Sequence, residues 1–241
     1  MAGVLKPTYR EVLRSDDPVI RRVHRLIRRT FPAHEIVEPN EWRDSLHERE
    51  AGLWSDTRWH LMVAEHRGEV VGVASGTYLG NVNIGVVGYL SVAPEARGSG
   101  VGSRMRARLR TLFRRDARSV HGRTLDAVVG EVRRDNPWLR ALIRSERVLA
   151  LDFTYYQPRL RPGDEPVPLV LYYEGIERPR HRLGCARIRT ILYSVWRRIY
   201  RVRRPLFHAA FRRMLRELEG RTSIGEIKLR DLPPAVRAAR P

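Results

Sequence analysis

The sequence is poor in cysteine and in lysine, and each shortage bears on the kinds of site or partner that the chain can have. Cys185 is the single cysteine of the 241 residues, which excludes an internal disulfide and a cysteine-rich metal site. We therefore expect a cytoplasmic protein without a bound metal. Lys6 and Lys228 are the only lysines, so arginine carries almost all of the positive charge. Such a bias also arises from a GC-rich genome and by itself identifies no partner.

Long apolar runs are missing as well. No stretch approaches the ~18 consecutive apolar residues that span a bilayer, and the amino-terminal MAGVLKPTYR has no signal-peptide core. The hydrophobic share of 42% is nevertheless enough to bury a core. We expect a soluble or at most peripheral protein, with a globular domain at residues 1–176 and a basic helical extension at 177–241. The net charge of +19 predicts attraction to nucleic acid and anionic membranes at low salt, although we do not favour either as the evolved partner.

The apolar periodicity predicts an α/β fold with a mixed, largely antiparallel sheet. Three strands in a row favour an antiparallel meander, and the strand, helix and strand that follow favour a central parallel crossover. The expected strands are Thr8–Leu13, Leu61–Ala64, Glu69–Tyr78, Ile84–Val92, Thr124–Val132, Phe153–Gln157 and Val167–Tyr173. The expected helices run from about Val19 to Phe31, from Pro39 to Glu50, from Gly98 to Arg118 and from Pro137 to Leu149.

The extension after Glu177 is rich in arginine and has two amphipathic stripes. Pro205 separates a stripe that ends at Tyr200 from a second one that begins at Leu206. We expect the stripes to bury each other, or to cover the α/β domain or the mate in a homodimer. The alternative is a basic surface that binds nucleic acid, a membrane or an acidic protein. The final DLPPAVRAARP is expected to be a loose tail.

One turn stands out, the stretch RGSGVGS from Arg97 to Ser103. It fails the dinucleotide fingerprint, which needs a third glycine at Ser103, and it fails the P-loop pattern, which needs lysine after Gly102. What remains is an Arg-x-x-Gly-x-Gly turn that follows a strand and opens a helix. Glycines let the backbone approach a bulky anion, and the first helix amides point at it, so the turn fits a diphosphate. A merely tight strand-to-helix turn is the alternative.

The stretch from Tyr89 to Ser103, YLSVAPEARGSGVGS, resembles the coenzyme A signature of the GNAT superfamily of N-acetyltransferases. A second block, Glu131 and Val132 followed by Asn136, is similar to a later block of that superfamily. Together the resemblance covers roughly residues 61–156. It implies the GNAT acyl-CoA N-acyltransferase fold, with acetyl-CoA as co-substrate and transfer of its acetyl group to a primary amine by direct attack.

The resemblance also implies the binding roles. The pantetheine arm would pair with the strand Leu90, Ser91 and Val92, with the thioester carbonyl near Leu90, whose neighbouring amides would stabilise an oxyanion. Asn136 would orient the pantetheine or a water, or would simply cap the helix that follows it. The diphosphate would lie on Arg97, Gly98, Ser99, Gly100, Val101, Gly102 and Ser103.

The usual catalytic residues of the family are missing. Some members have a glutamate on the pantetheine strand, but no carboxylate occurs between Gly80 and Pro94, and the position of the usual tyrosine is Ile143. Glu131 is then the candidate base, and Tyr155 or the adjacent Tyr156 the candidate acid. The alternatives are a strand-edge glutamate held by an arginine and tyrosines that pack on the sheet.

The acceptor end holds an acidic cluster in an otherwise basic chain. In the family the first two helices and their loop cover the amine site, so Glu35 and Glu38 are candidate substrate ligands for a small-molecule or protein amine. A solvated helix face is the alternative. The cluster consists of Glu35, Glu38, Glu41, Asp44, Glu48 and Glu50.

A different class of function also stays open, namely a degenerate coenzyme A-binding chain or an arginine-rich binding module without catalysis.

Overall fold

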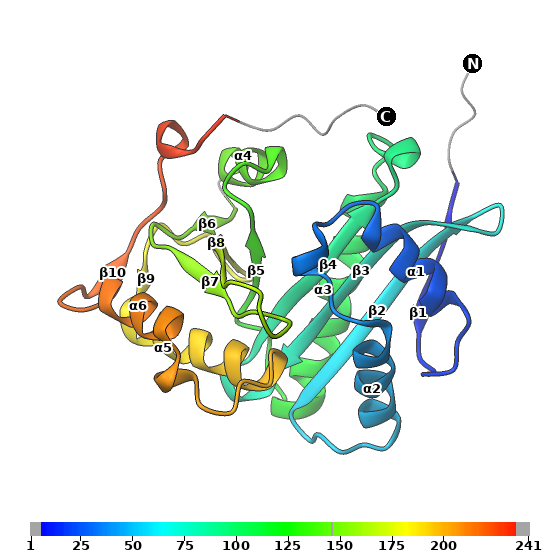
Figure 1. The fold of residues 1–241 in the computed structure, drawn as a ribbon, viewed down its shortest axis with the longest axis horizontal. Helices are drawn as coiled ribbons and strands as arrows, with labels where there is room; N and C mark the ends of the chain where they lie inside the picture. Colours follow the sequence, from blue (N-terminus) through cyan, green and yellow to red (C-terminus); the bar gives the residue numbers. More distant parts are fainter. Residues whose placement is uncertain (1–5, 146, 235–241) are drawn as a thin grey trace. The chain divides into compact units, whose positions relative to one another are not determined.

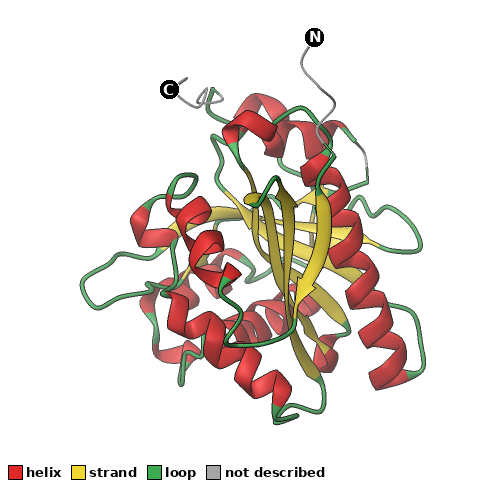
Figure 2. Ribbon diagram, turned by 90° about the vertical axis from the view of Figure 1, so that its right-hand side faces the viewer, coloured by secondary structure: helices red, strands yellow, loops and turns green. Residues whose placement is uncertain are grey.

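A computed structural model describes residues 6–145 and 147–234 of the chain. Helices and strands alternate along it, which confirms the predicted α/β class (Figure 2). The chain divides into two compact units, residues 1–125 and 126–241. The domain boundary between residues 176 and 177 stays a prediction. Most of the expected tail, residues 235–241, lies outside the described residues.

The first unit is a four-stranded antiparallel meander with three α-helices (Figure 1). The strands are hydrogen-bonded in the order β1-β2-β3-β4, each antiparallel to its neighbour, as the sequence predicted. The elements are β1 (Thr8–Val12), α1 (Val19–Arg28), α2 (Pro39–Glu50), β2 (Thr57–His66), β3 (Glu69–Leu79), β4 (Ile84–Val92) and α3 (Val101–His121). Short 3-10 turns occupy Ala33–Glu35, Gly80–Val82 and Pro94–Ala96.

Helices α1 and α3 cover opposite faces of this meander. The hydroxyl of Ser91 on β4 lies 2.8 Å from that of Thr30, just after α1. The next residue, Val92, faces α3, since a Cβ added at Gly102 would lie 3.3 Å from its Cγ2. Successive strand residues point to opposite faces, so the two helices enclose the strand between them. On the α3 face, β4 has a glycine at position 85, where a Cβ would overlap the ring of Phe113.

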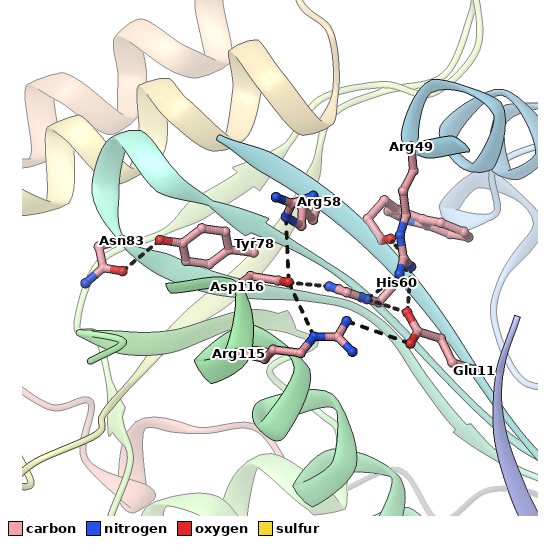
Figure 3. A network of polar contacts seen from close by, with 9 residues as sticks. Glu11, Arg49, Arg58, His60, Tyr78, Asn83, Arg115 and Asp116 are labelled. Atoms are coloured by element: carbon pink, nitrogen blue, oxygen red, sulfur yellow. Dashed lines mark hydrogen bonds and ion pairs between the residues drawn. The ribbon is translucent and has the colours of Figure 1, made fainter. Parts of the chain in front are cut away.

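A buried histidine connects three elements of this unit (Figure 3). The His60 side chain on β2 is fully buried. Its Nδ1 lies 2.7 Å from Oε1 of Glu11 on β1, and its Nε2 lies 2.5 Å from Oδ2 of Asp116 on α3. The His60 ring therefore bridges the side chains of Glu11 and Asp116.

Three arginines surround this histidine and its carboxylates. Arg49 from α2 donates to Oε1 of Glu11 at 2.5 Å. Arg58 and Arg115 approach Oδ1 of Asp116 at 3.7 and 3.9 Å, and Arg115 also lies 4.0 Å from Glu11. Burial by itself would raise the pKa of Glu11, but the hydrogen bonds and charges of His60 and Arg49 outweigh it and lower that pKa to about 2. These contacts therefore connect helices α2 and α3 to strands β1 and β2 of the meander.

In its described part, the second unit contains strands that pair with β8, one α-helix that precedes β8 in the chain and two α-helices that follow it. Strand β8 pairs antiparallel with β5, β6 and β7, while β9 and β10 form a separate ribbon. The elements are β5 (Ala127–Val132), α4 (Pro137–Arg144), β6 (Leu149–Ala150), β7 (Tyr155–Gln157), β8 (Val167–Gly175), β9 (Leu183–Gly184), α5 (Cys185–Ser194), α6 (Ala209–Glu217) and β10 (Ser223–Ile224). A π-helical turn spans Val195–Ile199, and 3-10 turns span Pro205–Phe207 and Leu229–Asp231.

One helix prediction is wrong at its end. The helix expected to reach Leu149 stops at Arg144, and Leu149 and Ala150 form strand β6 on β8. The error has a physical cause, because the residues from Val148 to Leu151 are all buried. A short apolar run of this kind continues a helical stripe as readily as it forms a buried strand.

The helical extension packs on its own unit. Trp196 is fully buried, and its indole Nε1 donates to the carbonyl of Tyr156 at 3.1 Å. On α6, the Met214 sulfur accepts from the Tyr156 amide at 3.2 Å. The buried stripe consists of Ile188, Ile191, Leu192, Val195, Trp196, Phe211, Met214 and Leu218. Among the described residues, no helix has both the length and the apolar character needed to cross a bilayer.

Candidate functional site

Strand β4 carries a bulge just before the predicted pantetheine segment. Its register against β3 shifts between the pairs Ala74 with Leu90 and Gly76 with Val87, so two β4 residues oppose Ser75 alone. The Ser75 hydroxyl accepts from the amide of Tyr89 at 3.1 Å. Such a bulge bends the strand and changes the direction of the backbone that follows it.

The backbone of β4 beyond the bulge has a defined orientation. The Ala93 amide donates to the Val71 carbonyl at 3.0 Å, which makes these two residues a hydrogen-bonded pair. Bonded and non-bonded pairs alternate along antiparallel strands, so Ser91 directs its backbone groups toward β3. Leu90 and Val92 direct theirs to the opposite edge of β4. An extended amide chain such as a pantetheine arm pairs with backbone groups of this kind.

The glycine turn follows β4 directly and opens the longest helix of the unit. Gly98 and Gly100 have φ values of +78° and +81°, which only glycine adopts without strain. Gly100 is the residue before the first turn of α3, and no atom lies within 4 Å of a Cβ added at Gly98. The first amides of a helix have no carbonyl of a preceding turn to bond. The turn therefore presents backbone donors at the positive end of the α3 dipole.

The charge around the turn is positive. Arg97 is exposed, and the Arg104 guanidinium lies over the turn, with its NH1 bonded to the Ser99 carbonyl at 3.3 Å. Helix α3 has one acidic residue, the buried Asp116, against the arginines at positions 104, 106, 108, 110, 114, 115 and 118. Open space, left-handed glycines and positive charge fit a diphosphate, so the residues present suit coenzyme A.

The second unit holds the predicted catalytic pair. Glu131 is half-buried on β5, and its Oε1 accepts from the phenol of Tyr155 at 2.6 Å. Its Oε2 accepts from the phenol of Tyr200, also at 2.6 Å. The carboxylate is thus held by two tyrosines, one from the sheet and one from the end of the π-helical turn. Their assignment as base and acid stays a prediction.

Tyr155 is the more constrained member of this trio. Its side chain is fully buried, and burial raises its pKa well above the usual value, with the negative charge of Glu131 adding to the effect. The phenol therefore keeps its proton at neutral pH.

Sequence reasoning missed Tyr200 as a partner of Glu131. The apolar periodicity places Tyr200 at the end of a buried stripe, whereas its hydroxyl donates to the Glu131 carboxylate. A tyrosine at the end of a stripe is the residue type that combines an apolar ring with a polar tip. The neighbouring candidate Tyr156 lies elsewhere, with its ring 5.2 Å from the Arg213 guanidinium.

Asn136 occupies the cap of α4. Its side-chain oxygen accepts from the Trp138 amide at 2.9 Å, which is the capping role left open by the sequence. A contact with pantetheine stays a prediction.

The predicted acceptor residues lie in the segment between α1 and α2, with Glu35 at the end of the 3-10 turn. Glu35 is buried, with its Oε1 3.7 Å from His34 Nε2, and Glu38 immediately precedes the helix, where its amide donates to Glu41. The Tyr89 phenol donates to the Glu35 carbonyl at 2.7 Å and accepts from the Val37 amide at 3.0 Å. The loop between α1 and α2 is therefore fastened to β4 one residue before Leu90, a connection that sequence reasoning missed.

Two other acidic residues of this cluster have structural partners. Glu48 accepts from the indole of Trp54 at 3.1 Å, and Glu50 accepts from the amide of Ser15 at 2.9 Å. Within residues 6–145 and 147–234, no group of three or more His, Cys, Asp or Glu side chains is placed to hold a metal ion.

Known proteins are similar to this chain in sequence and in fold. A family model described as acetyltransferase (GNAT) family matches residues 20–144. Among solved structures, a putative GNAT acetyltransferase from Bacteroides thetaiotaomicron is 17% identical, with a TM-score of 0.59 over 81% of this chain and 99% of that chain. A comparison with curated proteins gives no match.

Two further structures share the fold. One is a ribosomal-protein-alanine N-acetyltransferase from Brucella melitensis, 20% identical, with a TM-score of 0.50 over 70% of this chain and 99% of that chain. The other is a putative acetyltransferase from Salmonella typhimurium with its cofactor acetyl-CoA, 18% identical, with a TM-score of 0.50 over 72% of this chain and 95% of that chain. The family model covers just over half of the sequence, and the chain belongs to the acetyltransferase (GNAT) family.

Proposed function

We propose that the protein transfers an acetyl group from acetyl-CoA to a primary amine by direct attack, without a covalent enzyme intermediate. The observation that carries the proposal is the succession of β4 and the glycine turn. Leu90 and Val92 direct backbone groups away from β3, and eight residues after Val92 the left-handed Gly100 opens α3. This order suits a ligand with an amide-rich arm and a diphosphate.

Acetyl-CoA supplies an acyl group activated as a thioester. In the proposed role, Arg97 and the amides from Gly98 to Ser103 bind the diphosphate, while Leu90 and Val92 pair with the pantetheine arm. An amide near Leu90 then stabilises negative charge on the thioester carbonyl oxygen. Fixing the donor in this way converts the reaction into one between positioned groups, so no nucleophilic side chain is needed.

Glu131 is the proposed general base. A new bond between nitrogen and the acyl carbon forms as the carbon-sulfur bond breaks, so the amine loses a proton and the thiolate gains one. Glu131 takes the proton from the amine. The Tyr155 phenol, bonded to the same carboxylate, is the proposed acid, and Glu131 restores its proton. Two phenol donors support this role because they fix the carboxylate in one orientation.

The proposed acceptor is an amine that arrives as a cation. Glu35 is a buried carboxyl beside a loop that Tyr89 fastens to β4, and Glu38 adds negative charge at the start of α2. A carboxylate in such a place attracts an ammonium group more strongly than one in bulk water. The class covers small-molecule amines, lysine side chains and peptide amino termini.

A free-thiol release assay tests the proposal. The purified chain is incubated with acetyl-CoA and a panel of amines that includes polyamines, aminoglycosides, lysine peptides and a peptide with an amino-terminal alanine. The last one is included because one similar structure is a ribosomal-protein-alanine N-acetyltransferase. Thiol release that depends on one amine class, with the acetylated product seen by mass spectrometry, is the expected outcome.

A second candidate is a chain that binds coenzyme A without catalysis. It is favoured by the missing carboxylate between Gly80 and Pro94 and by Ile143 at the usual tyrosine position. Under this alternative, coenzyme A raises the melting temperature while no amine of the panel releases thiol. An arginine-rich binding module without a donor site would show no such thermal shift.

A further inference from the structure

Two apolar side chains are exposed at the turn before α6. Leu206 is 54% exposed and Phe207 74% exposed, although the stripes of α5 and α6 on either side are buried. Among the described residues, Phe207 has the largest exposed fraction of any large apolar side chain. We call the segment from Arg197 to Phe207 the arginine tip.

The arginine tip is held in place by its backbone. The Val202 amide donates to the Trp196 carbonyl at 3.0 Å, and the Phe207 amide donates to the Arg204 carbonyl at 3.1 Å. Pro205 is buried between the exposed residues on both sides of it. The exposure of Leu206 and Phe207 is therefore imposed by an ordered turn rather than by a loose loop.

Positive charge surrounds these two side chains. The Arg204 guanidinium lies 5.9 Å from the centre of the Phe207 ring. From Cys185 to Glu217 the sequence has ten arginines and one acidic residue, Glu217, whose carboxylate is bonded to the Thr154 amide at 2.9 Å. Five of the arginines lie in the tip itself, at positions 197, 198, 201, 203 and 204.

We propose that the arginine tip docks on the surface of an anionic lipid bilayer. Leu206 and Phe207 enter the interface between headgroups and acyl chains, and the arginines beside them bind the lipid phosphates. A basic cluster next to a small apolar wedge gives reversible binding, because neither the charge nor the apolar area is sufficient alone. This proposal does not depend on the proposed function, and Tyr200, the one residue of the tip that contacts Glu131, takes no part in it.

A bilayer explains this surface better than a nucleic acid does. Single-stranded nucleic acid is held by aromatic rings that stack on successive bases, with cations along the backbone. The tip has one exposed aromatic ring, Phe207, because Tyr200 is only partly exposed and donates to Glu131. Next to Phe207 lies Leu206, which has no π-face to stack. Paired apolar side chains at an exposed turn are suited to a fluid interface.

The chain offers an internal control. Leu53 and Trp54 are also adjacent and exposed, at 69% and 48%. Their surroundings lack an excess of positive charge. The Trp54 indole donates to Glu48, and residues 48–56 include three acidic side chains and one arginine. If apolar exposure alone drove membrane binding, both turns would contribute. If charge is required as well, only the arginine tip does.

The test is sedimentation of the full chain with vesicles. Vesicles of phosphatidylcholine mixed with phosphatidylglycerol should bind the protein, whereas vesicles of phosphatidylcholine alone should not. The double variant L206S/F207S should lower the partition coefficient roughly tenfold, and each arginine of the tip changed to glutamine should lower it roughly fivefold. The control L53S should leave it unchanged. Circular dichroism and the melting temperature check that every variant is folded.

Three outcomes would overturn the proposal. In the first, L206S/F207S binds anionic vesicles as well as the unchanged chain does, so that binding rests on net charge alone. In the second, a single-stranded oligonucleotide binds more tightly than the vesicles, and the F207S substitution weakens it. In the third, lipid-free protein forms dimers by light scattering that L206S/F207S abolishes, which would assign the tip to a second copy of the chain.

Discussion

Tyr200 and Glu131 lie 69 positions apart in the chain, and the phenol of one donates to Oε2 of the other at 2.6 Å. The contact connects the helical extension to β5, the strand that bears the proposed base. The extension therefore has a place in the proposed chemistry, because it helps to orient Glu131 through the carboxylate oxygen that Tyr155 does not bond.

The Tyr200→Phe substitution should lower kcat by roughly tenfold, which corresponds to the loss of one hydrogen bond to a charged group. The ionised carboxylate loses a donor, so protonated Glu131 gains in relative stability and the acid limb of the rate profile moves to higher pH. The KM for acetyl-CoA should not change. Tyr193→Phe, on the exposed side of α5, is the matched control. An unchanged pH profile in Tyr200→Phe would reduce Tyr200 to a packing role.

The Glu131→Gln substitution should slow transfer at neutral pH by about a hundredfold or more, as expected for removal of a general base. The amide keeps the size of the side chain, so the thermal shift on adding acetyl-CoA should remain. Glu165→Gln, on an exposed loop, serves as the control. A rate equal to that of the unchanged chain would move the base elsewhere, with the acidic segment around α2 as the next candidate.

The Gly100→Val substitution should abolish the rise in melting temperature caused by acetyl-CoA, because its side chain occupies the space needed by the diphosphate. Gly102→Val should also abolish it, but by displacing the turn, since a Cβ at Gly102 would lie 3.3 Å from Val92 Cγ2 on β4. Gly122→Ala is the matched control. It lies at the other end of α3 with φ +64°, so it carries a similar strain of about 1 kcal/mol in the free protein. Retention of the full thermal shift in Gly100→Val would rule out the turn as the donor site.

The Glu11→Gln substitution should destabilise the fold in a pH-dependent way. The pKa of Glu11 is lowered from 4.5 to about 2, so its ionised form contributes stability above about pH 4.5 that is lost as the pH falls through about 2. The variant should therefore melt lower than the unchanged chain at neutral pH, with a difference that shrinks below about pH 4.5. Thermal melts over this range measure it, with the exposed Glu69→Gln as control. A constant difference would show that Glu11 acts through packing.

The Glu35→Gln substitution should raise the KM for a cationic acceptor by about tenfold, the effect of losing one partly desolvated charge partner. The KM for acetyl-CoA should stay the same. Glu48→Gln, whose carboxylate is engaged by Trp54, is the control. Equal KM values for the acceptor in Glu35→Gln and the unchanged chain would place amine recognition outside this loop.

The sequence predicted the parts of the site that depend on neighbouring residues. The glycine turn was predictable because the position of each glycine relative to Arg97 and to the helix start determines the local backbone. The start of β4 followed from the turn-prone residues before Ile84, and the start of α2 from Pro39. What the sequence did not predict depends on contacts between distant segments. The partner of Glu131 and the two carboxylates on His60 are set by strand register and by the way helices pack on strands.

The end of α4 illustrates the same limit. The residues after Arg144 fit a helical stripe, but β8 offers them a strand partner, and the Leu151 amide bonds to the Leu171 carbonyl at 3.0 Å. Pairing with β8 decides that these residues form a strand and not a helix, and the local sequence does not indicate this pairing.

The histidine between two carboxylates also constrains how the sequence can evolve. A buried ion that loses one partner costs about 3 to 5 kcal/mol, whereas exchange of the whole group for apolar residues of similar volume is nearly neutral. Substitutions at positions 11, 60 and 116 should therefore be inherited together. In a set of relatives, the three positions are expected to covary as a block, with carboxylate, histidine and carboxylate either all present or all replaced.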